Sequence, residues 1–284
     1  MSTIGYHSGG PSRATRTRQE NSIAVTLPKI IAFDLDDTLA PSKSPLDPRM
    51  AELLGGLLAR TEVCVISGGQ FGQFTSQVIE NLPDLPQESL SRLHLMPTCG
   101  TQYYVHRDGE WDQVYAEHLT DDEKSRALAA VEARAKELGY WESETWGPIL
   151  EDRGSQITFS ALGQSAPVDA KAAWDPTGEK KNSLRDAVQA DLPDLEVRSG
   201  GSTSVDITRR GIDKAFGIDR LSKMTGVELV DFLFVGDRLD PHGNDYPVKA
   251  MGVECVAVEG WEHTATFLDS LLADARVDES ALRA

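Results

Sequence analysis

The sequence predicts an α/β fold in which a Rossmann-like parallel sheet carries an inserted α+β cap domain. Three observations support this fold class. Short apolar runs alternate with helical patterns near both ends of the chain, the middle combines alternating strands with charged helices, and acidic residues directly follow two of the apolar runs. Strands that alternate with helices are typical of parallel sheets covered on both faces.

Two apolar segments of the first half are expected to be strands, and two segments of the second half are expected to join them in the same sheet. In the first half, strands are predicted over 29–33 and 62–67, with helices near 47–60 and 71–82. In the second half, a helix is predicted over 217–226, with strands over 231–237 and 253–259.

The middle of the chain follows a different pattern. A hairpin over 101–118 should turn at Asp108 and Gly109. A helix over 120–139 should begin at Thr120, with Glu123 completing a capping box. Half-exposed strands are expected over 155–160 and 202–208, with a charged helix over 180–192 between them. We therefore expect a disordered leader over 1–28, a core made of 29–113 and 201–284, and an α+β cap over 114–200.

Composition narrows the possible functions. The chain has 284 residues and a net charge of -17, from 45 acidic and 28 basic side chains, which disfavours general binding to nucleic acid or to an anionic membrane. Apolar runs fall short of the roughly 20 residues of a membrane span, and the amino terminus lacks a secretory apolar segment. Three scattered cysteines are too few for a disulfide framework. We expect a soluble cytoplasmic protein, monomer or homodimer, that acts on a small substrate.

Polar residues follow three of the predicted strands at their carboxyl ends. Asp34, Ser67 and Asp237 hold these positions, and Asp36 and Thr38 come directly after Asp34. Ligands of parallel α/β sheets bind beyond the carboxyl ends of the strands, so these side chains should share one edge. Hard carboxylate oxygens favour Mg²⁺, which also accepts phosphate oxygens. The sequence therefore predicts a site for Mg²⁺ and a phosphoryl group.

The spacing of Asp34 and Asp36 favours phosphoryl transfer. Residues at i and i+2 of an extended segment point to the same side, so both carboxyl groups can face one substrate. Asp34 can then attack phosphorus, while Asp36 protonates the leaving alcohol and later deprotonates the next nucleophile. Lys214, which opens a helix, would supply positive charge, and Thr38 and Ser67 would also bind the phosphate.

Four segments resemble the motifs of the haloacid dehalogenase (HAD) superfamily. They are "DLDDT", Ser67, Lys214 and "GDRLDPHGND", and the block between Ser67 and Lys214 resembles a type IIB cap. More narrowly, the segments "GDRLDPHGND", "SGGSTSVDITRRGIDK" and "DRGSQITFSALGQ" resemble segments of eukaryotic-type phosphomannomutases. The resemblance implies that Asp34 is the nucleophile and Asp36 the acid and base. It also implies Mg²⁺ bound by Asp34, the Asp36 carbonyl and Asp237, with support from Asn244 and Asp245.

The departures from this family concern the cap. Arg153 matches one of the arginines that hold the non-reacting phosphate, but Gln164 stands at the position of another, and Lys43 replaces an arginine of the core. Glutamine cannot replace the charged fork of arginine at a phosphate. Ser202, Ser204 and Asp206 are expected to contact the substrate from the cap hinge, with Asp206 binding hydroxyl groups.

With fewer arginines to hold the non-reacting phosphate, the site favours hydrolysis of a phosphorylated sugar through an aspartyl phosphate. The alternative is a phosphomannomutase that interconverts mannose 1-phosphate and mannose 6-phosphate. A non-enzymatic, receiver-like phospho-switch is disfavoured, because receivers are shorter and have no cap. The presence of Asp36 beside Asp34 also favours turnover over a long-lived phosphorylated state.

Overall fold

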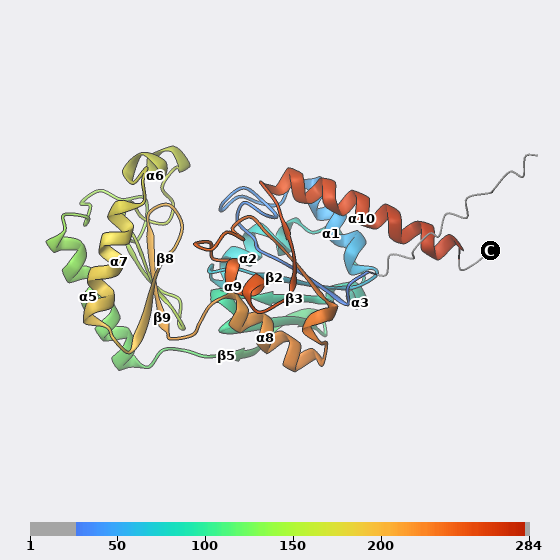
Figure 1. Ribbon diagram of the computed structural model, residues 1–284, viewed down its shortest axis with the longest axis horizontal. Helices are drawn as coiled ribbons and strands as arrows, with labels where there is room; N and C mark the ends of the chain where they lie inside the picture. The colour runs from blue at the N-terminus through green and yellow to red at the C-terminus, as the bar shows by residue number, and fades with distance from the viewer. Residues whose placement is uncertain (1–26, 282–284) are drawn as a thin grey trace, which may run out of the picture.

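The structure is a computed structural model that describes residues 27–281, with side chains described through residue 274. The expected leader over 1–28 therefore lies outside the described residues, apart from Leu27 and Pro28. Two sheets organise the chain, one of seven strands and one of four, and they form two units that lie next to each other (Figure 1).

The larger sheet has the strand order β11-β10-β1-β2-β3-β4-β5. Its strands are β1 (Ile30–Phe33), β2 (Glu62–Ile66), β3 (Leu93–Met96), β4 (Gln102–Arg107), β5 (Glu110–Ala116), β10 (Phe232–Gly236) and β11 (Glu254–Ala257). The strands from β11 to β3 pair in parallel, whereas β4 and β5 are antiparallel. β1 lies between β2 and β10, with Ile30 in register with Glu62 and Phe232. This mostly parallel sheet confirms the predicted α/β class.

Helices cover both faces of the larger sheet (Figure 1). They are α1 (Pro48–Leu58), α2 (Phe71–Gln77), η1 (Ile79–Asn81), α3 (Gln87–Leu90), α4 (Pro97–Gly100), α8 (Lys214–Thr225), η2 (Leu229–Asp231), α9 (Tyr246–Ala250) and α10 (Trp261–Ala281). α1 and α10 pack on one face, where Leu54 and Leu268 join the cluster that contains Phe33. α8 and α9 pack on the other face, where Ile218 and Val248 join Ala32. Because β1 is buried on both faces, its sequence is a continuous apolar run.

The smaller sheet is antiparallel and has the strand order β6-β7-β9-β8. Its strands are β6 (Leu150–Asp152), β7 (Ile157–Ser160), β8 (Leu195–Ser199) and β9 (Ser204–Arg209), and its helices are α5 (Asp121–Glu137), α6 (Val168–Trp174) and α7 (Glu179–Asp191). Val131 of α5 and Leu184 of α7 pack with Phe159 of β7 in a separate apolar cluster. The capping box of Thr120 and Glu123 is present at the start of α5, as predicted.

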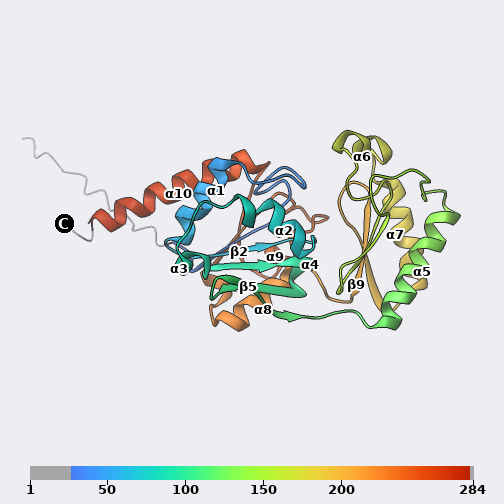
Figure 2. The same cartoon turned by 180° about the vertical axis from the view of Figure 1, so that it is seen from behind.

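Three features of the middle segment differ from expectation. The hairpin of β4 and β5 turns at Asp108 and Gly109 as predicted, but it extends the larger sheet up to Ala116, and Figure 2 shows the chain passing from β5 to α5. β7 is buried along its whole length, so the expectation of a half-exposed strand there is wrong. Ile157 and Phe159 pack in the apolar cluster of the smaller unit, while Thr158 and Ser160 form hydrogen bonds with Asp206 and Ser204 of β9. β9 belongs to the smaller sheet. The last strand of the larger sheet before the smaller unit, β5, ends at residue 116, and the last strand of the smaller sheet, β9, ends at residue 209. The domain limits at 113 and 200 stay a prediction.

Within residues 27–281, no helix is both long and apolar enough to cross a membrane.

Candidate active site

Three acidic side chains meet at the carboxyl ends of the parallel strands. Asp34 follows β1, Asp237 follows β10, and Asp245 precedes α9. One carboxylate oxygen from each lies within 4.8 Å of the other two. In Figure 2 this edge of the larger sheet faces the smaller unit, so the acidic group lies between the two units. The edge that the sequence predicts is therefore the one where these acids gather.

Lys214 supplies the opposite charge to two of these carboxylates. Its Nζ lies 2.7 Å from Asp34 Oδ1 and 2.5 Å from Asp245 Oδ1. The Lys214 side chain is only 1% exposed. Burial alone would lower its pKa, but the two carboxylates reverse this effect and raise the pKa above the usual value for lysine.

The two oxygens of Asp34 have different surroundings. Oδ1 accepts hydrogen bonds from Lys214 and, at 2.7 Å, from the backbone N–H of Leu35. Oδ2 receives no hydrogen bond from any residue between 27 and 274. Burial raises the pKa of Asp34 to about 8, Lys214 opposes the shift, and Asp245 and Asp237 add to it. One oxygen is therefore fixed in place and the other is available to a ligand.

The donor set fits a divalent cation. Three carboxylates share this small volume with a single ammonium group, and burial together with Asp245 also raises the pKa of Asp237. Such an excess of negative charge is costly unless a cation offsets it. Oxygen donors of this kind suit Mg²⁺. The Asp36 side chain is not part of this carboxylate group. The roles expected for the Asp36 carbonyl and for the exposed Asn244 stay predictions.

The predicted phosphate-binding hydroxyls adjoin the acids. Thr38 is fully buried, and its Oγ1 donates to Asp237 Oδ1 at 3.3 Å. Ser67 is buried after β2, and its Oγ accepts a hydrogen bond from the backbone N–H of Gly69 at 3.3 Å. Both hydroxyls and Lys214 thus lie on loops and helix starts of the same sheet edge.

Asp36 is held by a turned loop and by helix α2. Its Oδ1 accepts the backbone N–H of Lys43 at 2.7 Å, and its Oδ2 accepts Gln73 Nε2 at 3.0 Å. Asp37 and Lys43 both have positive φ angles, 60° and 57°, and these turn the loop back toward Asp36. The sequence motifs gave no indication of Gln73, because a glutamine on a short helix carries no recognisable spacing.

Two lysines converge on Gln164 where the smaller unit meets the core. Lys43 Nζ and Lys171 Nζ each lie 3.1 Å from the carbonyl oxygen of Gln164, and Lys43 also reaches its Oε1 at 2.5 Å. Neither lysine has a carboxylate within 4.0 Å among residues 27–274. Partial burial of its ammonium end, with Lys171 and Arg153 nearby, lowers the pKa of Lys43 to about 8. Lys171 was not predicted from the sequence, although it is a basic residue in the cap.

Arg153 and Asp206 are committed to contacts within the protein. Arg153 Nη2 lies 2.7 Å from Glu151 Oε2, and its Nη1 donates to the Gly68 carbonyl of the core at 2.8 Å. Asp206 Oδ1 accepts hydrogen bonds from Thr158 and Gln156 at 2.7 and 2.8 Å. Burial raises the pKa of Asp206, and Arg153 opposes this shift.

Of the two predicted serines, Ser204 is linked through Ser160 to Gln164, the residue that Lys43 and Lys171 approach. Ser204 Oγ lies 3.1 Å from Ser160 Oγ, which in turn accepts Gln164 Nε2 at 2.6 Å. Ser202 is exposed, and its side chain makes no hydrogen bond within residues 27–274.

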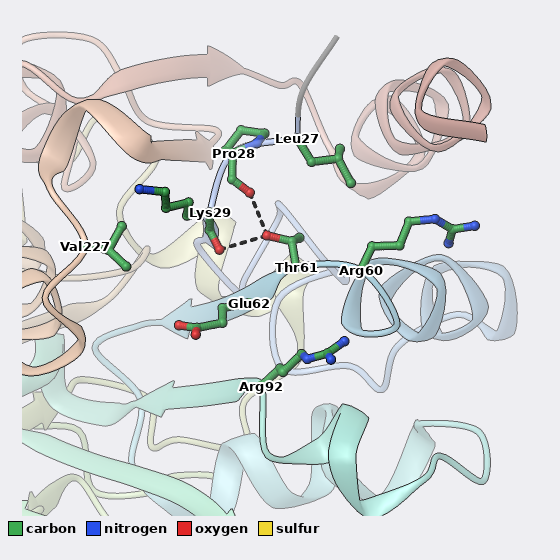
Figure 3. A pocket seen from close by; sticks show the side chains of 8 residues that line it. All are labelled: Leu27, Pro28, Lys29, Arg60, Thr61, Glu62, Arg92 and Val227. Atoms are coloured by element: carbon green, nitrogen blue, oxygen red, sulfur yellow. Dashed lines mark hydrogen bonds between the residues drawn. The ribbon is translucent and has the colours of Figure 1, made fainter. Parts of the chain in front are cut away.

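A hollow of about 400 Å³ lies at the opposite edge of the larger sheet, where the parallel strands begin (Figure 3). Thr61 there donates to the carbonyl oxygens of Pro28 and Lys29 at 2.6 and 2.8 Å. Lys29 pairs with Asp231, and Arg92 pairs with Glu88. None of the predicted site residues lines this hollow, so it is separate from the acidic site.

No protein-family model matches the chain. The chain is 22% identical to phosphomannomutase 1 of Mus musculus over 224 residues, which covers 77% of this chain and 82% of that relative. It is 24% identical to a probable phosphomannomutase of Caenorhabditis elegans over 264 residues, covering 86% of this chain and 96% of that relative. Among solved structures, the truncated, IMP-bound IMP-nucleotidase of Plasmodium falciparum superposes with a TM-score of 0.66. Its identity is 13%, over 88% of this chain and 69% of that one.

The sequence similarity to phosphomannomutases, together with the fold and the acidic edge with its buried lysine, supports assignment of this chain to the enzymes of the haloacid dehalogenase superfamily. The chain is similar to phosphomannomutases over most of its length, so the assignment is phosphomannomutase-like. The resemblance seen in the motifs is thereby confirmed.

Proposed function

We propose that this enzyme hydrolyses a phosphorylated sugar in a Mg²⁺-dependent reaction that passes through an aspartyl phosphate on Asp34. The observation that carries this proposal is the unequal environment of the Asp34 carboxylate. Lys214 and the Leu35 N–H hold Oδ1, while Oδ2 has no partner among the described residues. A fixed carboxylate with one available oxygen is suited to attack phosphorus.

In the proposed reaction, Asp34 Oδ2 forms a bond to phosphorus as the bond from phosphorus to the sugar oxygen breaks. Asp36 gives its proton to the departing oxygen and then removes a proton from the water that attacks the aspartyl phosphate. As the oxygen of that water bonds to phosphorus, the bond from phosphorus to Asp34 Oδ2 breaks, which restores the Asp34 carboxylate and releases inorganic phosphate. Lys214 and the hydroxyls of Thr38 and Ser67 orient the phosphoryl oxygens and offset their charge. Bound Mg²⁺, held by Asp34, Asp237 and Asp245 with help from the Asp36 carbonyl and Asn244, would supply further positive charge.

The contacts of the cap support hydrolysis over sugar-phosphate isomerisation. A mutase must grip a bisphosphorylated sugar at both ends, and here Gln164 supplies no charge to such a grip. Arg153 is already engaged by Glu151 and Gly68. The remaining candidates for contact with the sugar are Lys43, Gln164, Ser202, Ser204 and Asp206.

A phosphomannomutase activity is the second candidate, and one observation favours it. Lys43 and Lys171 approach the same carbonyl oxygen, and neither forms a salt bridge with a carboxylate in the described part of the chain. Two such ammonium groups could bind a second phosphate of the substrate.

The test is an assay of the purified protein with Mg²⁺ and mannose 1-phosphate, with and without a catalytic amount of glucose 1,6-bisphosphate. Free phosphate released in both conditions is the expected result for a sugar phosphatase. Formation of mannose 6-phosphate only when the bisphosphate is present would establish the mutase instead. Asp34→Asn should abolish either activity, and near-normal rates in that variant would exclude Asp34 as the nucleophile.

A further inference from the structure

Helix α2 places a neutral hydrogen-bond donor against the residue proposed as general acid and base. Gln73 Nε2 donates to Asp36 Oδ2 at 3.0 Å, while the other oxygen, Oδ1, accepts the Lys43 N–H at 2.7 Å. Each oxygen of the carboxyl group therefore has a donor: Oδ2 accepts from Gln73 of α2, and Oδ1 accepts from the loop over residues 37–43 and, at 3.4 Å, from Gln77 Nε2. Such contacts restrict the rotation of a side chain that would otherwise occupy several rotamers.

The side-chain amide of Gln73 occupies space that is free because residue 69 is a glycine. A Cβ atom on Gly69 would lie 2.2 Å from Gln73 Oε1, so the amide occupies the space that any other residue at position 69 would fill. Gly69 also donates its N–H to the hydroxyl of Ser67. Gln73 thus connects the loop proposed to bind the phosphoryl group with the loop that carries Asp36.

A neighbouring glutamine stabilises the same loop. Gln77, which is 2% exposed, donates to the Ser44 carbonyl at 2.7 Å and lies 3.4 Å from Asp36 Oδ1. The backbone carbonyl oxygen of Gln77 accepts the N–H of Leu46. Gln77 therefore holds the backbone of the loop, whereas Gln73 reaches only the Asp36 carboxyl group.

We propose that Gln73 is a positioning residue that holds the Asp36 carboxyl group in the orientation needed for proton transfer to the leaving oxygen. This inference rests on the proposed phosphatase function. An uncharged amide suits the task, because it orients the carboxyl group without forming an ion pair with it. The loss of activity on removal of the Gln73 amide should therefore be larger for a leaving group that needs protonation than for one that does not.

The test compares two phosphate esters in Gln73→Ala. Mannose 6-phosphate has a poor alkoxide leaving group and needs a proton, whereas p-nitrophenyl phosphate releases a stabilised phenolate and needs little help. The value of kcat/KM reports the steps up to formation of the aspartyl phosphate. We expect it to fall about ten- to hundredfold for mannose 6-phosphate and less than about threefold for p-nitrophenyl phosphate. Gln73→Glu, which keeps the size but places a carboxylate against Asp36, should show at least the same selective loss.

Three further variants make the result decisive. Gln70→Ala is the matched control, because Gln70 is exposed at the start of the same helix and its side chain makes no capping hydrogen bond. It should behave as wild type with both esters. Asp36→Asn should show a larger selective loss, about 10²- to 10⁴-fold with mannose 6-phosphate. Adding Gln73→Ala to Asp36→Asn should cause no further loss, because the two residues then act through one group.

The outcomes separate this inference from the function on which it rests. Equal losses with both esters in Gln73→Ala, or a rise in KM alone, would overturn the positioning role while Asp36→Asn still lost activity selectively. An Asp36→Asn variant that hydrolysed mannose 6-phosphate normally, or a wild-type protein inactive on both esters, would overturn the proposed function and this inference with it. Equal melting temperatures of Gln73→Ala and Gln70→Ala would show that the fold is intact.

Discussion

Lys214 is the single residue on which the charge balance of the site depends most. It is buried between Asp34 and Asp245, so its removal leaves two buried carboxylates without their partner. Loss of one member of a buried ion pair costs about 3–5 kcal/mol. We expect Lys214→Met to lower the free energy of unfolding by about that amount, measured by urea denaturation in the presence of a chelator.

Lys223 on the same helix provides the control for that measurement. It forms an exposed pair with Asp219 at 2.5 Å. Exposed ion pairs of this spacing contribute about 0.5 kcal/mol or less to the free energy of unfolding. A Lys214→Met variant no less stable than Lys223→Met would contradict the burial argument.

The three acids predict that Mg²⁺ stabilises the folded protein. A ligand that binds only the folded state adds about 2.7 kcal/mol when its concentration is 100 times its Kd. The melting temperature of wild type should therefore rise with added Mg²⁺, and Asp237→Asn should lose most of that rise. Asp240→Asn, at an exposed acid of the same loop, should keep it. An equal rise in all three proteins would contradict a site at Asp237.

The paired lysines predict a selective effect on substrates with two phosphates. Lys171→Met should raise KM for glucose 1,6-bisphosphate about tenfold or more, because one charge-assisted contact is lost. The KM for p-nitrophenyl phosphate should stay within about twofold, since that ester has no second phosphate. Initial-rate measurements with both esters test this, and equal changes would place Lys171 outside the substrate site.

Single residues show which parts of the site could be predicted from the sequence. Asp34 and Asp237 follow strands whose apolar runs are easy to detect, so their meeting at one edge followed from the topology of parallel sheets, whereas Asp245 was indicated only by the family resemblance. Gln73 and Lys171 could not be predicted in this way. Their placement depends on the path of one loop and on how the smaller unit faces the core, and no local pattern encodes either.

At the scale of elements, the capping box of α5 also joins that helix to the smaller sheet. Glu123 accepts the Thr120 N–H at 2.7 Å and pairs with Arg209 of β9 at 2.9 Å. Arg209, followed by the Thr120 backbone, lowers the pKa of Glu123 to about 2. A carboxyl group whose pKa is depressed by folding stabilises the protein above its unfolded pKa of about 4.3, and that contribution is lost as the pH falls toward 2.

We therefore expect Glu123→Gln to be less stable than wild type at pH 6, with a difference that shrinks as the pH falls from about 4.5 to about 2. Urea denaturation at several pH values measures this. Glu144→Gln, at an exposed glutamate without a hydrogen bond in the described region, should show no such trend. A constant difference at all pH values would assign the effect to packing rather than charge.

Elements also differ in how readily they were predicted. The helix α5 has a capping box, a long charged face and Gly139 after its end, and its prediction was correct almost to the residue. The strands β3 and β8 were not predicted. Each is short, with four and five residues, so the alternation of apolar and polar residues covers too few positions to separate a strand from a loop.

At the scale of the whole molecule, buried hydroxyl groups join the two units. Ser155 of the smaller unit lies 3.0 Å from Thr98 Oγ1 and 2.6 Å from Thr101 Oγ1 of the core. All three residues are nearly fully buried. Ser155→Ala would leave the two threonine hydroxyls with fewer partners, so we expect a loss of about 1–3 kcal/mol in unfolding free energy.

Ser165→Ala is the control, because Ser165 is exposed and its side chain makes no hydrogen bond among residues 27–274. Its effect should stay within about 0.5 kcal/mol. Chemical denaturation followed by circular dichroism measures both variants. Equal stability of the two would mean that the buried hydroxyl cluster does not hold the units together.

The position of β1 between β2 and β10 has a consequence for synthesis on the ribosome. β2 emerges soon after β1, but β10 begins at Phe232, after the whole smaller unit has been made. At about 5–20 residues per second, one edge of β1 stays without its partner for roughly 10–40 s. Asp34 therefore leaves the ribosome long before Lys214 and Asp245. Until nearly all of the chain has been translated, β1 lacks its pairing with β10 and Asp34 lacks its ion pair with Lys214.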